Sequence, residues 1–147
     1  MKVPHGAQVM VVDGGRLALF VNRGREFEPA LELVEQEQAE FPKTSELGAD
    51  RPGRAFESSG SRRSAYEVTD IHDRAEEQFV SAAAKRLEAM LADPKAQVLL
   101  VAAPRALGVM RKVMPGDVRA RLVGEVPKAY GGMSAAELSG VLAKLDA

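Results

Sequence analysis

The order of apolar and polar residues near the start of the chain predicts a β-hairpin over residues 8–22. An apolar run, Val9–Val12, precedes Asp13-Gly14-Gly15, a turn sequence whose glycines accept positive φ at both central positions. After the turn, apolar and polar residues alternate. One face carries Leu17, Leu19 and Val21, and the other carries Arg16, Ala18, Phe20 and Asn22. Because the first run is apolar throughout, we expect its strand to be covered on both faces, near the centre of a sheet.

A third strand is predicted over Glu28–Gln36. Pro29 is tolerated only at an edge or at the start of a strand, which favours an edge position. The segment that follows is acidic, with Glu32, Glu35, Glu37 and Glu40. We interpret these carboxylates as a solvated edge that discourages strand-to-strand association, in preference to a cation site.

Further along, apolar residues at spacings of three and four predict a long amphipathic helix that begins at Asp70 or Asp73 and ends at Asp93-Pro94. The short apolar run 96–102 predicts a buried strand joined by a crossover connection. We expect one core to be shared by six residues of these segments and the first strand: Phe79, Ala83, Leu87, Val98, Leu100 and Val11.

The C-terminal part predicts a helix from Pro104 to about Lys112, a last strand within 118–126, a turn at Gly131-Gly132 and a final helix opened by a Ser134–Glu137 capping box. The whole chain, 1–147, is interpreted as a single α/β domain. The order of elements indicates a mixed five-stranded sheet with helices packed on its faces.

Residues 41–69 form a compositional break and are predicted to be a long flexible loop, rich in Gly, Pro, Ser and Arg. Four arginines against one glutamate give 51–66 a local charge of +3. One interpretation is a solvated, disordered loop; the other is a segment that orders on phosphate, as in RNA binding. The candidate binding residues are Arg51, Arg54, Arg62, Arg63 and Tyr66.

Composition narrows the function classes. The net charge of −1 provides no field that draws the whole molecule to nucleic acid or anionic lipid. With no cysteine, disulfides, thiolate metal sites and cysteine nucleophiles are excluded. No apolar run is long enough for a signal peptide or a membrane span, so we expect a cytoplasmic protein.

Few residues suggest catalysis. The two histidines, His5 and His72, have no recognisable metal-ligand spacing, and we interpret His72 as a first-turn helix residue. Asp13 is interpreted as a turn former in preference to a metal ligand. The Gly131-Gly132 pair lacks the pattern of a phosphate loop. Whether the protein is an enzyme stays open, with a non-enzyme favoured, and we expect no cofactor and no metal.

Several segments together resemble the bacterial "host attachment protein" family, relatives of the central domain of archaeo-eukaryotic release factors. The matching segments are the opening hairpin, 53–58, the helix near His72 with Phe79 and Leu87, the step from strand to helix at 97–104, and the closing helix. The resemblance covers essentially the whole chain. It implies a ribonuclease-H-like topology.

In catalytic release factors of this kind, a Gly-Gly-Gln tip lies just before the long helix and assists hydrolysis of peptidyl-tRNA. The equivalent segment here, Ser59–Tyr66, has no Gly-Gly-Gln. The resemblance therefore implies a non-catalytic ribosome- or RNA-associated factor, with the ribosome or tRNA contacted through the basic loop. The alternatives are a protein-interaction factor that supports attachment to host cells and a hydrolase of unknown substrate.

Overall fold

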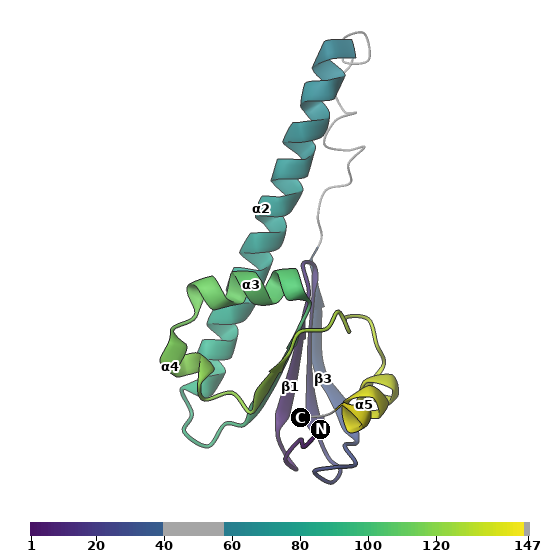
Figure 1. Ribbon diagram of the computed structural model, residues 1–147, viewed down its shortest axis with the longest axis vertical. Helices are drawn as coiled ribbons and strands as arrows, with labels where there is room; N and C mark the ends of the chain where they lie inside the picture. The colour runs from purple at the N-terminus through teal and green to yellow at the C-terminus, as the bar shows by residue number, and fades with distance from the viewer. Residues whose placement is uncertain (40–57, 146–147) are drawn as a thin grey trace.

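The computed structural model describes residues 1–39 and 58–145, except for the side chains of 58–70 and 72. Five strands form one sheet in the order β3-β2-β1-β4-β5 (Figure 1). They are β1 (Gln8–Val12), β2 (Arg16–Asn22), β3 (Leu31–Gln38), β4 (Val98–Ala102) and β5 (Gly124–Val126). β1 is antiparallel to β2 and parallel to β4, so the predicted mixed five-stranded sheet is confirmed. The strand order is compatible with the expected ribonuclease-H-like topology.

Helices cover both faces of this sheet (Figure 1). One face carries α2 (Ser58–Leu91) and α3 (Pro104–Val113), with the short α4 (Gly116–Arg119) beside them; the other carries α5 (Ala135–Lys144). α3 has a proline in its first turn and α5 is opened by the Ser134–Glu137 capping box, as predicted. No helix in the described ranges is both long and apolar enough to cross a membrane.

The central strand β1 divides the interior into two cores. Met10 and Val12 pack with α2 and α3, whereas Val9 and Val11 pack with α5 on the other side. β1 is therefore covered on both faces, as its apolar run predicts. The expectation of one shared core holds for the residues of α2 and β4 but is wrong for Val11, because neighbouring residues of a strand point to opposite faces.

The hairpin turn differs from its expected geometry. Neither Gly14 nor Gly15 has a positive φ. Instead, the Asp13 carboxylate accepts a hydrogen bond from Gly15 N at 2.9 Å, and Asp13 N donates to Arg16 O at 3.0 Å. The side chain of Asp13 thus closes the turn by bonding the backbone two residues on, which is a common role for aspartate.

α2 begins at Ser58, so its expected start at Asp70 or Asp73 is wrong, and the part of the predicted loop from 58 to 69 is helical. The first turns of α2 extend well beyond the sheet (Figure 1). A helix that leaves the body needs no apolar stripe, and for that reason periodicity did not reveal it. The rest of the predicted loop, 41–57, lies outside the described residues.

β3 is an edge strand, as expected from Pro29, although it begins three residues later than predicted and ends at Gln38. Two of its carboxylates bind arginines of the protein itself. Glu32 pairs with Arg23 at 3.1 Å, and Glu35 pairs with Arg86 of α2. The predicted last strand is shorter than expected, because α4 occupies the beginning of that segment.

Asn22, at the end of β2, is fully buried among backbone groups. Its Nδ2 donates to Val3 O at 2.9 Å, and its Oδ1 accepts from Gly24 N at 2.8 Å and Ala30 N at 3.0 Å. One side chain therefore ties the N-terminal segment to the connection between β2 and β3. Such a buried amide is tolerated because both its donor and its acceptor are satisfied.

Candidate functional site

The sequence-predicted binding residues fall into two groups. Arg51 and Arg54 lie outside the described residues. Positions 62, 63 and 66, which hold Arg62, Arg63 and Tyr66, belong to the part of α2 that extends beyond the sheet (Figure 1). The fifteen residues from 58 to 72 span about 22 Å at the rise of an α-helix. The structure thus brings three of the five positions together on one helical segment, away from the body.

The base of this projecting segment is anchored to the body. Asp73 forms an ion pair with Arg105 of α3 at 3.0 Å, and from Val80 onward α2 contributes buried residues to the core. The hydrogen bond from Arg105 to Asp73 raises the pKa of the Arg105 guanidinium above its ordinary value. α2 is therefore fixed to the sheet and to α3 along its C-terminal half.

The candidate catalytic and metal-binding residues show no catalytic arrangement in the described part. Asp13 is a turn former, as interpreted from the sequence. Nδ1 of His5 lies 2.8 Å from Gly24 O. The side chain of His72 is not among those that the structure describes. Within residues 1–39 and the described side chains of 71–145, no three His, Asp or Glu residues gather as metal ligands.

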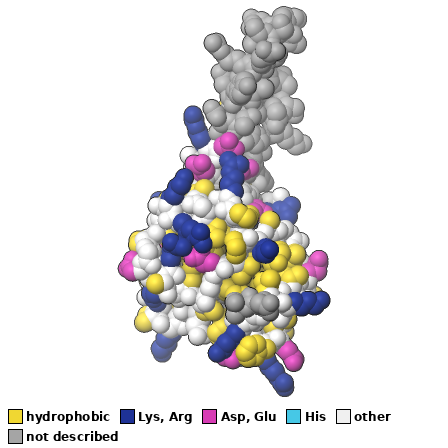
Figure 2. Space-filling view, viewed as in Figure 1, with side chains coloured by type: hydrophobic (Ala, Val, Ile, Leu, Met, Phe, Trp, Pro, Cys, Tyr) yellow, Lys and Arg dark blue, Asp and Glu magenta, His cyan; other side chains and the backbone are white. Residues whose placement is uncertain are grey.

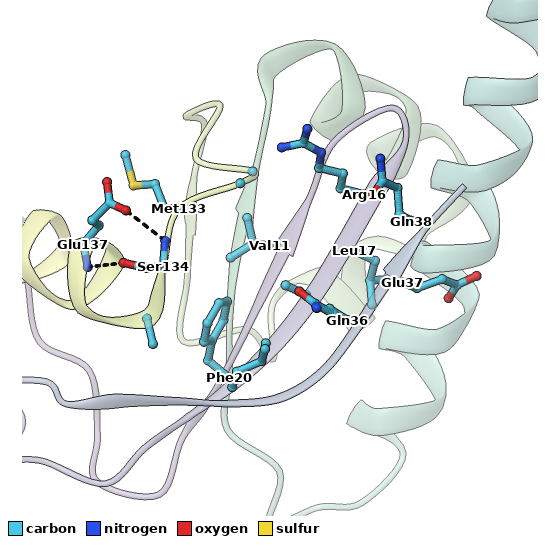
Figure 3. Close-up of a pocket in the computed structure, with 15 residues that line it drawn as sticks. Val11, Arg16, Leu17, Phe20, Gln36, Glu37, Gln38, Met133, Ser134 and Glu137 are labelled. Carbon is cyan, nitrogen blue, oxygen red and sulfur yellow. Dashed lines mark hydrogen bonds between the residues drawn. The ribbon is translucent and has the colours of Figure 1, made fainter. Parts of the chain in front are cut away.

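A cavity of about 610 Å³ opens on the α5 side of the sheet (Figure 3). Its floor comes from β1 and β2, through Val11, Ala18 and Phe20, and its far side from β3. The wall opposite is the segment 131–135, which leads into α5. Its size falls within the range of small-molecule sites, about 300–1,000 Å³. Sequence analysis did not identify this cavity.

Strand register explains how the cavity forms. Three pairs of residues from β2 and β3 line the cavity: Arg16 with Gln38, Ala18 with Gln36, and Phe20 with Leu33. The register shifts between Leu19 and Phe20, so Gln36 and Leu33 are three residues apart although their partners are two apart. α5 packs Leu138 and Leu142 into the core on this face, and its Ser139 Oγ accepts a hydrogen bond from Leu31 N at the start of β3. The helix thus covers one end of β3 and leaves the other end open.

The tip of the hairpin contacts the segment before α5 through a pair of glycines. A Cβ on Gly131 would collide with the Asp13 carboxylate, and a Cβ on Gly132 would collide with Nη1 of Arg16. Gly132 also has φ +90°, a conformation that favours glycine. The Gly131-Gly132 turn therefore allows the close approach of Asp13 and Arg16, which sequence spacing alone could not reveal.

Arg16 is the cation of this cavity. No carboxylate of the described residues lies within ion-pair distance of its guanidinium. Glu37 also lines the cavity from β3, with its side chain extending toward α2 (Figure 3). Glu137 accepts a hydrogen bond from Ser134 N at 3.3 Å in the capping box. The sequence did hold one sign of this site, because Arg16 shares a strand face with the apolar Phe20.

The visible face of the body shows no single basic patch. Lysine and arginine side chains are spread around it, with acidic side chains between several of them (Figure 2). On β3, Glu35 hydrogen bonds to Arg86, which lowers the pKa of the Glu35 carboxyl below its ordinary value of 4.5. This ion pair joins the edge strand β3 to α2.

Comparison with known proteins assigns the chain to a family. A search of curated proteins finds no significant match. The sequence model of one family, described as "Protein required for attachment to host cells", matches residues 8–142. This range runs from the first residue of β1 to within α5, so it includes the whole sheet and the cavity. The protein is a member of this host-attachment family.

Proposed function

We propose that the protein is a non-catalytic factor that binds RNA or the ribosome, similar to a stand-alone central domain of an archaeo-eukaryotic release factor. The observation that carries the proposal is the projection of α2, whose first turns extend beyond the sheet (Figure 1) while its C-terminal half is fixed in the core. A narrow helical projection is suited to entering a groove or channel that the body cannot enter.

The charge of the segment supports a polyanionic partner. Residues 51–66 carry a local charge of +3 in a chain whose net charge is −1. Positions 62 and 63 lie four and three residues before position 66, so each of them is a neighbour of position 66 on the helix surface. Arginine forks engage two phosphate oxygens at once, and an aromatic ring stacks on unpaired bases. We therefore assign RNA binding to Arg51, Arg54, Arg62, Arg63 and Tyr66.

The same segment argues against peptide release. Ser59–Tyr66 carries no Gly-Gly-Gln, the tip that assists hydrolysis in catalytic release factors. We expect the purified protein to release no peptide from peptidyl-tRNA on stalled ribosomes. Its part in attachment to host cells then follows indirectly, through RNA or ribosomes in the cell.

A second candidate function is binding of a protein partner. It is favoured by apolar side chains exposed at and before the edge strand β3, with Phe27 67% and Val34 56% exposed. An edge strand also offers unpaired backbone groups to an incoming strand. In this case, the protein supports attachment through a complex whose formation does not depend on RNA.

Binding to ribosomes or structured RNA over a salt series tests the proposal. The test variant replaces Arg54, Arg62 and Arg63 with alanine. The matched control replaces three exposed body cations, Arg25, Lys128 and Lys144, and so removes the same charge. If each arginine of the test variant contacts a phosphate, the slope of log affinity against log salt should fall by about two to three units in that variant alone.

Each outcome distinguishes the alternatives. Equal affinity and equal slope in wild type and test variant would reject the RNA site. Equal losses in the test and control variants would mean that only net charge matters, which also contradicts the proposal. A stable protein complex that survives ribonuclease and is lost on Val34→Glu would instead support the second candidate.

A further inference from the structure

We propose that the cavity between β2, β3 and the segment 131–135 is a binding site for a small organic anion, one that carries a single negative group on an apolar body. This site lies on the face of the sheet that α5 covers, opposite the face that carries α2. The inference depends on cavity shape, the placement of one guanidinium and the chemistry of the lining.

The apolar half of the site lies deep in the cavity. Phe20 and Val11 are almost fully covered and form its floor, while Leu33 on β3 stays 42% exposed at its side. Met133 contributes a flexible thioether from the opposite wall (Figure 3). An apolar ligand body placed here would remove Leu33 and Met133 from water, which is favourable in proportion to the area covered.

The polar half lies at the open end. Arg16 extends from the start of β2 toward the 131–133 segment (Figure 3), where its guanidinium lies against Gly132. It has no carboxylate partner among the described residues. Gln36 and Gln38 line the same end from β3, and no hydrogen bond within the described set occupies their amides. A planar guanidinium with two amides beside it matches the two oxygens of a carboxylate or a sulfonate.

Charge counting limits the ligand to one negative group. Glu137 stands at the first turn of α5, where the positive end of the helix dipole offsets its carboxylate. Asp13 Oδ1 is bound to Gly15 N, but its second oxygen faces Gly131. Glu37 lines the cavity as well, so one guanidinium stands among three carboxylates and a polyphosphate would be repelled. A monoanion that reaches Arg16 is the chemistry that fits.

The first test titrates wild-type protein with 8-anilinonaphthalene-1-sulfonate, a fluorescent dye with one sulfonate on an aromatic body. We expect one saturable site. Arg16→Gln should weaken binding about tenfold or more, the effect of losing a charge-assisted hydrogen bond. Arg16→Lys keeps the charge without the fork and should lose less. The matched control is Arg25→Gln, an exposed arginine away from the cavity, and it should bind as wild type does.

Two further measurements separate the parts of the site. N-phenyl-1-naphthylamine, the neutral counterpart of the dye, should bind wild type and Arg16→Gln equally. Octanoate should displace the dye, whereas inorganic phosphate, which has no apolar body, should not. In amide NMR spectra, shifts on dye binding should concentrate at 131–133 and 36–38. Ala18→Phe should fill the cavity and abolish dye binding; if that variant does not fold, Arg16→Gln decides.

The inference is overturned by any of three results. These are absence of saturable dye binding, equal dye affinity of wild type and Arg16→Gln, or amide shifts that concentrate on α2 and α3. Failure of the RNA-binding test leaves this inference intact, because the inference is argued only from described residues that line the cavity, and none of these is replaced in that test.

Discussion

Two glycines with positive φ offer a measurement of how Arg16 is positioned. Gly6 has φ +83° and Gly132 has φ +90°. A Cβ on Gly6 would meet no atom within 4 Å, whereas a Cβ on Gly132 would meet the guanidinium of Arg16. Gly6→Ala therefore reports the backbone strain alone, and Gly132→Ala reports the same strain together with displacement of Arg16.

The expected magnitudes follow from this geometry. A left-handed conformation costs an L-residue about 1–2 kcal/mol, and replacing glycine by alanine recovers about 0.4–1 kcal/mol by restricting the unfolded chain. Each variant should thus lose about 1 kcal/mol of unfolding free energy, or roughly 2–4 °C in Tm for a chain of this size. The guanidinium is the far end of a flexible side chain, so moving it should add little.

Urea denaturation and dye titration of both variants are the assays. Their unfolding free energies should agree within about 0.5 kcal/mol, the range of a neutral surface change, yet only Gly132→Ala should bind the dye more weakly. Two results would refute the reasoning. One is a loss of unfolding free energy in Gly132→Ala that exceeds the loss in Gly6→Ala by roughly 2 kcal/mol or more. The other is a Gly132→Ala variant with wild-type dye affinity.

Three further substitutions test the fold. Leu87→Ala, at a fully buried position on α2, should lose about 2–5 kcal/mol in urea denaturation, whereas Glu88→Ala, exposed on the next residue, should stay within about 0.5 kcal/mol. Asn22→Ala should lower the free energy of unfolding by about 2–4 kcal/mol, because several backbone groups lose their hydrogen-bond partner. A near-neutral change would contradict the role given to the hydrogen bonds of the Asn22 side chain. The pKa of Glu35 is lowered by its hydrogen bond to Arg86. The contribution of the ionised Glu35 to the free energy of unfolding is therefore complete above its unfolded pKa of 4.5, and it is lost as pH falls through the lower folded value. The stability gap between wild type and Glu35→Gln should therefore close below about pH 4.5, and a gap that is constant from pH 7 to 3 would exclude this linkage.

Local patterns predicted the elements whose packing follows from neighbouring residues. The apolar run 9–12 indicated a strand covered on both faces, and Ser134 with Glu137 indicated the start of α5. The same approach placed the start of α2 twelve or more residues too late, because Ser58–Thr69 lies beyond the sheet and has no apolar face to bury. Periodicity detects contact with a core, not helicity itself.

The cavity required information that no single segment contains. Arg16, Gln36 and Gly132 are far apart in the sequence, and their proximity depends on the register of β2 with β3 and on the path of the chain into α5. The alternation of β2 did place Arg16 and Phe20 on one face. It did not indicate that α5 would leave this end of the face open, since that depends on the length and position of a helix more than a hundred residues away.

The central position of β1 has a consequence for the order in which the chain folds. Met10 pairs with Leu19, nine residues away, and also with Leu100, ninety residues away. A tenfold longer closed loop adds about 2 kcal/mol of entropic cost, so the hairpin gains its contacts much more cheaply than the parallel pair does. The β1–β2 hairpin is thus the natural early structure, and docking of β4 the late one. Formation of α2 within the intervening chain shortens the distance that this late step must close.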